Sequence, residues 1–154
     1  MAADIERGTV TISKNDDELR ELQVEHQSGE VRQDVEHMEP YGFSSEPYTD
    51  KKTDAITFYT DESHELGFVM CVADRRFRVK SLKTGEVVIY DDKKRHIYLK
   101  RDCIDIDGVD DPINIHTKGD INITSNANIN IKADSEVNVT ADKVNVKAST
   151  STVV

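Results

Sequence analysis

Several residue types are scarce in this chain of 154 residues. It has no tryptophan, and aromatic residues make up only 6% of the sequence. With 36% hydrophobic residues and so few large rings, a single chain can build only a modest core. Self-association would supply the burial that the lone chain lacks.

Scarce cysteine and the lack of long apolar runs exclude further classes. Cys71 and Cys103 are the only two cysteines, and neither their number nor their spacing fits a disulfide scaffold or a metal site. A reduced, cytosolic origin is therefore expected. No run approaches the roughly 18 apolar residues that span a bilayer. The first residues, MAADIERG, lack the apolar core of a signal peptide.

The sequence also lacks a catalytic or metal-binding pattern. There is no G-x-S-x-G motif, no phosphate-cradling loop and no Cys-His nucleophile arrangement. Adjacent carboxylates occur in predicted turns, where Asp is common because it bonds its own backbone: Asp16-Asp17, Asp91-Asp92 and Asp110-Asp111. The histidines are scattered singly and are expected to be solvated or in the core: His26, His37, His64, His96 and His116. We therefore expect no enzymatic activity, no cofactor and no metal.

Charge is unevenly distributed along the chain. The net charge is −10, and residues 1–50 hold 13 Asp and Glu against 4 Lys and Arg. Such an acidic N-terminal part argues against a nucleic-acid partner, whose phosphates it would repel. The basic stretch from Arg75 to Lys80 is expected to dock on an acidic neighbour, such as the N-terminal segment of an adjacent protomer.

Residues 1–112 contain a series of short strand-like runs. Leu19–Met38 is typical of a hairpin that turns at Ser28-Gly29, with Leu22 and Val24 opposite Val31 and Val35. A helix over Asp16–Gln27 is the alternative. The other predicted strands are Gly8–Ser13, Ala55–Thr60, Leu66–Ala73, Arg76–Leu82, Glu86–Tyr90, Arg95–Lys100 and Cys103–Asp107. Seven or eight short strands predict a small antiparallel barrel that ends at Gly108–Pro112.

The stretch Ile113–Val146 has a different pattern. An apolar-Asn-apolar triplet begins at Ile113 and recurs with spacings of eight, eight, eight and seven residues. From Ile113 to Ala141, every odd position holds a small or apolar residue and every even position holds a polar one. Threonine is the one residue type that occurs in both sets. A two-residue period this long indicates one continuous β path with an apolar face and a polar face. Eight residues are too few for one coil of a single-chain β-helix, so three chains must each supply one side.

We therefore predict that residues 113–154 form one strand of an intertwined three-stranded β-helix needle in a homotrimer. The expected trimer interface consists of the ten triplet residues Ile113, Ile115, Ile121, Ile123, Ile129, Ile131, Val137, Val139, Val144 and Val146. The shorter last spacing predicts a tightened corner near Asp142, with Lys143 turned outward. Val153 and Val154 would form a blunt apolar end on which a separate tip protein can dock.

Three stretches together resemble a known family. They are YGFSSEP at residues 41–47, the block from Val72 to Gly108 with its DRRFR, LKTGEV and YDD motifs, and the octad repeat. The chain resembles the central spike of contractile phage tails, the baseplate assembly protein V family, and in particular its Mu-like branch. The resemblance implies an oligonucleotide/oligosaccharide-binding-type barrel used as a structural plug, a homotrimer, and a shaft that points at the host envelope.

From this resemblance we expect an all-β protein, with residues 1–112 docking to the baseplate hub protein and residues 113–154 forming the spike. The trimer would be assembled in the host cytoplasm, reside in the virion tail baseplate, plug the tube end and pierce the host outer membrane mechanically. Family members often carry a C-terminal His-x-His pair that binds iron, but no His follows His116 here. Two alternatives remain: the spike of a bacterial contractile injection or secretion system, and a receptor-binding tailspike that cleaves glycans.

Overall fold

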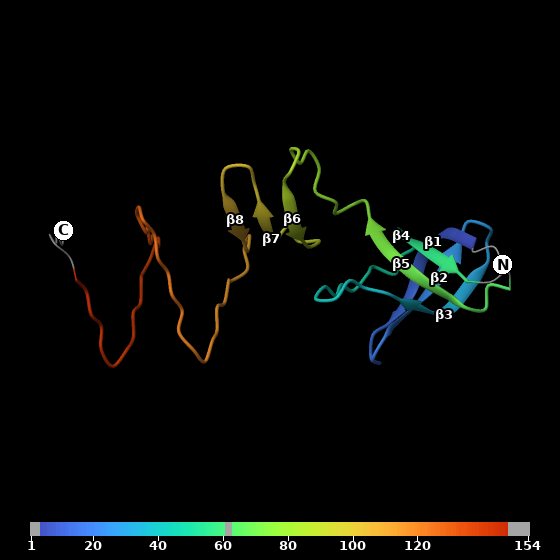
Figure 1. Ribbon diagram of the computed structural model, residues 1–154, viewed down its shortest axis with the longest axis horizontal. Coiled ribbons are helices and arrows are strands. Elements are labelled where there is room, and N and C mark those ends of the chain that lie inside the picture. Colours follow the sequence, from blue (N-terminus) through green and yellow to red (C-terminus); the bar gives the residue numbers. More distant parts are fainter. Residues whose placement is uncertain (1–3, 61–62, 148–154) are drawn as a thin grey trace. The chain divides into compact units, whose positions relative to one another are not determined.

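Eight β-strands make up the regular structure of the residues described by the computed structural model, 4–60 and 63–147. Five of them close a barrel in the order β1-β2-β3-β5-β4, and three form a separate sheet in the order β6-β7-β8 (Figure 1). The strands are β1 (Asp4–Lys14), β2 (Arg20–His26), β3 (Val31–His37), β4 (Thr53–Tyr59), β5 (Gly67–Asp74), β6 (Val87–Tyr90), β7 (His96–Leu99) and β8 (Ile104–Asp107). In the described ranges, no helix has the length and apolar character needed to cross a membrane.

The barrel encloses a small aliphatic core. Alternate side chains point inward along its strands, as in β4, where Thr53, Ala55, Thr57 and Tyr59 are buried and their neighbours are not. The apolar core residues are Val10, Leu22, Val24, Val35, Ala55 and Val69. A closed five-stranded barrel confirms the all-β fold class and the predicted barrel.

The β2–β3 hairpin forms where the sequence predicts it, so the helical alternative over Asp16–Gln27 is wrong. The hairpin turns through Gly29, whose φ of +87° is a conformation that glycine adopts without strain. Leu22 pairs with Val35 as predicted, but Val24 pairs with Arg32. A bulge at Asp34, with φ 56°, inserts one extra residue into β3 and shifts the register.

The barrel is smaller than predicted and is not wholly antiparallel. It closes through a parallel pairing of β3 with β5, in which His37 lies opposite Val69. The strands after β5 pair only with each other. The predicted strand at Arg76–Leu82 is wrong, because this segment joins neither sheet and is described without strand structure.

The chain divides into two units between Ile113 and Asn114. Just before the division, Asp111 N donates to Gly108 O at 3.0 Å. A Cβ on Gly108 would lie 2.4 Å from the Asp111 carbonyl oxygen, so this tight turn requires glycine.

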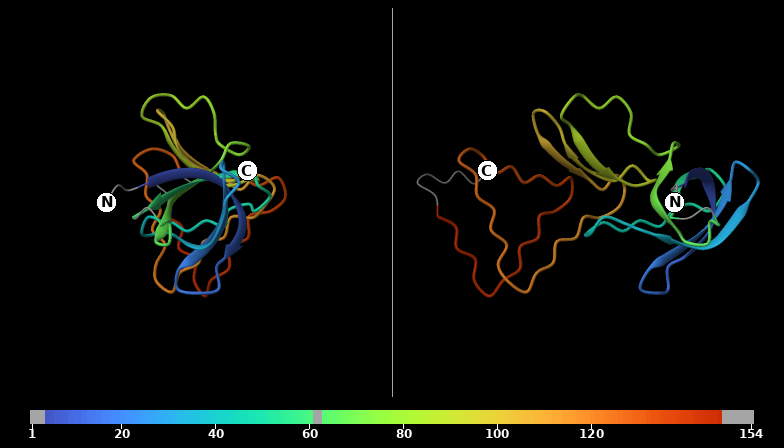
Figure 2. Two further views of the ribbon diagram at one scale, coloured as in Figure 1. Left: turned by 90° about the vertical axis from the view of Figure 1, so that its right-hand side faces the viewer. Right: turned by 45° about the vertical axis from the view of Figure 1, so that its right-hand side comes forward.

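The second unit, described to residue 147, is an extended chain with regular bends (Figures 1 and 2). The bends fall at residues 118–119, 126–127, 134–135 and 142, which follows the octad spacing of the sequence. Two of them are closed by side chains: Gly119 N donates to Thr117 Oγ1 at 3.0 Å, and Ala127 N donates to Ser125 Oγ at 3.1 Å. Within this single chain the described residues 114–147 form no strand ladder. The three-stranded needle and the homotrimer therefore remain predictions.

Candidate functional site

The sheet β6-β7-β8 has one face made entirely of aliphatic side chains. Its register places Val87, Leu99 and Ile104 in one row across the three strands, and Ile89, Ile97 and Ile106 in the next. All six are exposed, from 41% for Leu99 to 68% for Ile104. We call these six residues the apolar sheet face. The sequence analysis missed this face, although the period-two alternation in each strand carries the signal.

The opposite face of the same sheet is polar and internally bonded. Tyr98 OH donates to Glu86 Oε2 at 2.6 Å, and Lys100 Nζ donates to Asp105 Oδ2 at 2.6 Å. The hydrogen bond from Tyr98 lowers the pKa of Glu86, and the one from Lys100 lowers the pKa of Asp105. The sheet is therefore two-sided, with one solvated face and one face that lacks cover.

The triplet residues of the second unit form another uncovered apolar row. In every triplet the first aliphatic residue is 53–57% exposed and the second aliphatic residue is 70–86% exposed. A lower and a higher exposure therefore alternate in all five triplets, including the last one after the shortened spacing. Ten regularly spaced aliphatic side chains exposed in this way mark an interaction surface. Val153 and Val154, the predicted docking end, lie outside the described residues.

Burial of these exposed aliphatic side chains in an assembly would contribute a large favourable free energy of association. Burying one large aliphatic side chain contributes about 1.5–3 kcal/mol. The six residues of the apolar sheet face retain roughly half of their exposure, so covering them contributes about 5–9 kcal/mol per chain. Covering the triplet row would contribute a burial free energy of similar or greater size per chain.

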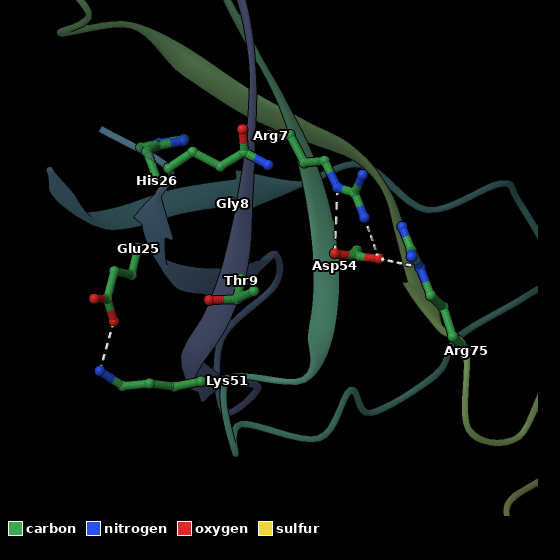
Figure 3. Close-up of a pocket in the computed structure, with 9 residues that line it drawn as sticks. Arg7, Gly8, Thr9, Glu25, His26, Lys51, Asp54 and Arg75 are labelled. Atoms are coloured by element: carbon green, nitrogen blue, oxygen red, sulfur yellow. Dashed lines mark hydrogen bonds and ion pairs between the residues drawn. The ribbon is translucent and has the colours of Figure 1, made fainter. Parts of the chain in front are cut away.

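The barrel carries a polar cavity of about 350 Å³, shown in Figure 3. On one side Arg7 and Arg75 both bind Asp54, with nitrogen-to-oxygen distances of 2.7 and 3.0 Å, while on another side Lys51 Nζ lies 2.5 Å from Glu25 Oε2. The hydrogen bond from Arg7 lowers the pKa of Asp54. Each of these charged groups is engaged in an ion pair, so this cavity offers neither a free acid and base nor a continuous basic groove.

The basic stretch after β5 binds carboxylates of its own chain. Besides the Arg75 contact, the Arg76 guanidinium pairs with Asp74 and lies 2.6 Å from Asp50 Oδ2. It also lies over the rings of Tyr48 and Phe77, at 5.2 and 5.0 Å from their centroids. The expected acidic neighbour from another protomer is therefore not needed for Arg75 and Arg76, because the acidic partners come from the same polypeptide.

The histidines and paired carboxylates are placed largely as predicted, with one exception. Asp91 Oδ1 accepts hydrogen bonds from Lys93 N and Arg95 N, both at 3.0 Å, which is the predicted turn role. His37 is buried and His116 is exposed. His26 and His64 are not isolated, however, because both contact Tyr59. Sequence spacing does not carry this signal, since barrel closure brings the three residues together.

Comparison with known families gives one match. Residues 7–76 match the family model described as Bacteriophage Mu Gp45, N-terminal. The match covers the five-stranded barrel except the first three residues of β1, includes the stretch at residues 41–47, and ends at Arg76, before the β6-β7-β8 sheet. Comparison with curated proteins gives no significant match.

Proposed function

Because residues 7–76 belong to the Bacteriophage Mu Gp45, N-terminal family, we propose that this chain is the homotrimeric central spike of a contractile phage tail. The resemblance to the Mu-like spike family is confirmed over this region, and the family is that of a phage tail or baseplate component. Association with other tail or baseplate proteins and a place in the virion tail follow from it. The spike role, the trimer and the piercing of the host envelope are the proposal.

The observation that carries the proposal is the pair of uncovered apolar surfaces, the apolar sheet face and the triplet row. The sheet face ends at Ile106 and the triplet row begins at Ile113, so the two surfaces are neighbours in sequence. Both need cover, and two further copies of the chain present the same surfaces. Three chains arranged around one axis can bury every copy of both surfaces at once. Two chains would supply only two of the three sides of such an assembly, so part of each apolar surface would stay exposed.

The proposed mechanism is mechanical. In a three-stranded β-helix each chain pairs along the axis with its neighbours, so backbone groups that one chain leaves unpaired are bonded and no lateral edge remains to peel. A thin shaft built in this way transmits axial force from a contracting sheath without buckling. The Asn, Lys and Asp side chains of the even positions face water, and the aliphatic rows fill the interior.

The other parts of the proposal follow from this role. The barrel docks on the baseplate hub protein and plugs the tube end, and the needle meets the host outer membrane. We propose that the spike is not an enzyme. The paired charges of the barrel cavity and the turn roles of the adjacent carboxylates support this. A separate tip protein at the C-terminal end completes the proposal.

Matched substitutions in the triplet row test the trimer. Ile121→Asp with Ile129→Asp places charge in the proposed interior, whereas Asn122→Asp with Asn130→Asp adds the same charge one residue away on the proposed outer face. Sedimentation equilibrium on the untagged chain should give three 17.4 kDa protomers for the parent and the asparagine control, and single chains for the isoleucine variant. A stable trimer of the isoleucine variant would overturn the proposed interface.

A further inference from the structure

Three potential metal ligands come together at the start of the barrel. Asp4 and Glu6 are two residues apart on β1 and so face the same side, while His64 lies between β4 and β5. One ligand atom from each lies within 4.8 Å of the others. His64 Nε2 is 3.1 Å from Asp4 Oδ2, and the other Asp4 oxygen accepts a hydrogen bond from Ile5 N at 2.8 Å.

The imidazole of His64 is held in place by its surroundings. Its ring stacks on Tyr59 with 4.3 Å between centroids and 11° between planes, and its side chain is 17% exposed. Its φ of 57° is a left-handed conformation in which histidine is enriched among non-glycine residues. Thr60 N donates to Leu66 O at 3.0 Å, which closes the base of the connection that carries His64. The His64 ring is therefore held against Tyr59, and Thr60 and Leu66 on either side of it are hydrogen-bonded to each other.

A second and independent feature lies on the inner side of the cluster. The side chain of His26 is only 1% exposed, and its Nδ1 points at Glu6 Oε2 from 3.1 Å. Neither of these buried atoms has a hydrogen-bond partner of acceptable geometry. A buried carboxylate oxygen without a partner is costly, and the contact between Asp4 and His64 does nothing to satisfy it. A cation bound to the other oxygen of Glu6 would fix the carboxylate and let Oε2 settle into a hydrogen bond with His26 Nδ1.

Tyr59 orients the inner histidine. Its hydroxyl lies 2.8 Å from His26 Nε2, within hydrogen-bond distance. With Nε2 beside the Tyr59 hydroxyl, Nδ1 is the ring nitrogen of His26 that faces Glu6. A polar group that holds a ligating carboxylate in place is a usual outer support of a metal site.

We propose that Asp4, Glu6 and His64 form a binding site for a divalent transition-metal ion of the zinc class, with His26 and Tyr59 as positioning residues. Zinc accepts imidazole nitrogen and carboxylate oxygen at about 2.0–2.2 Å, which places neighbouring ligand atoms about 3.4 Å apart. The ligand atoms of the three residues lie within 4.8 Å of one another, and His64 Nε2 is already 3.1 Å from Asp4 Oδ2. An imidazole among three ligands selects zinc, cobalt or nickel over magnesium and calcium, which prefer oxygen alone. The ion would tie the β4–β5 connection to the start of β1 and lock that end of the barrel.

The test is metal binding to the untagged full-length chain after removal of bound metals by a chelator. Cys71 and Cys103 are exposed free thiols that could also bind zinc, so both are changed to serine in every sample. Calorimetric titration with zinc should give about one ion per chain, and thermal unfolding should shift upward with zinc but not with magnesium. His64→Gln should weaken zinc binding at least tenfold, whereas the matched changes His96→Gln and His116→Gln should not.

Two further measurements keep the test decisive if His64→Gln folds poorly. Cobalt bound to the parent should give visible absorption of a nitrogen and oxygen site, and zinc should shift the Nε2 resonance of His64 in nitrogen NMR. Tyr59→Phe, which removes the hydroxyl and keeps the ring, should weaken zinc binding while leaving the His64 stack in place. Zinc binding that is absent, matched by magnesium, or unchanged in His64→Gln would overturn the proposal.

Discussion

Substituting Ile97 by aspartate probes the apolar sheet face at its centre. Ile97 lies on the middle strand between Ile89 and Ile106, and 45% of it is exposed in the single chain. Covering that remainder in a trimer contributes about 1 kcal/mol per chain. A carboxylate at this position forfeits that contribution and also loses its hydration without gaining a partner, which raises the cost to at least about 3 kcal/mol per chain.

Three copies of the change therefore cost about 9 kcal/mol per trimer, which is roughly a million-fold in the association constant. Sedimentation velocity at micromolar concentration should show the parent as a trimer and Ile97→Asp as dissociated chains. Ile97→Leu keeps volume and polarity and should remain trimeric. Thr84→Asp adds the same charge in an exposed turn and should do so as well. A trimer of unchanged stability in Ile97→Asp would refute the role given to this face.

Three further predictions concern the barrel. Leu22→Ala, at a fully buried core position, should lower the free energy of unfolding by about 2–5 kcal/mol in urea titrations, whereas the exposed Leu19→Ala should change it by less than about 0.5 kcal/mol. Burial lowers the pKa of His37 below its ordinary 6.5, so the unfolded chain takes up a proton there before the folded one does. Stability should fall as pH drops below about 6.5, and His37→Gln should flatten this slope; an equal slope in both proteins would contradict the assignment. The Arg76 hydrogen bond lowers the pKa of Asp74 to about 2, so its contribution is present above about pH 4 and is lost toward pH 2. Arg76→Met should therefore lose less stability than the parent between these two pH values, and an equal loss in acid urea titrations would count against the pairing.

Local alternation was sufficient to predict most strands but not the closure of the barrel. The β2–β3 hairpin follows from Ser28-Gly29 and the flanking alternation, and its turn lies where that pattern indicates. The shift of Val24 to Arg32 depends on a bulge at Asp34, and β3 is too short for its alternation to reveal a single inserted residue. The end of the barrel at Asp74 also escaped prediction, because closure depends on which edges meet in space and not on the strand character of Arg76–Leu82.

Of the proposed functional surfaces, one could also be predicted from the sequence and the others could not. The triplet row was visible in the sequence because its repeat has a strict period over many residues. The apolar sheet face consists of three four-residue strands, each too short to stand out, and only their register aligns Val87, Leu99 and Ile104. The cluster around His64 was not predicted, since its members come from β1, from β2, from the end of β4 and from the β4–β5 connection. No sequence spacing predicts contacts between residues that lie close together only because the barrel closes.

Hydrogen–deuterium exchange over residues 114–147 tests the central claim most directly. In a single chain these residues form no strand ladder, so their amides would exchange as fast as those of an unfolded peptide. In the proposed three-stranded needle they are bonded to neighbouring chains, and exchange should be slowed at least as strongly as in β2 and β4 of the barrel, which serve as the internal reference. Protection should recur in each octad and disappear in the Ile121→Asp, Ile129→Asp variant but not in the asparagine control. Complete exchange of residues 114–147 within seconds, while the barrel strands remain protected, would contradict the needle and with it the spike.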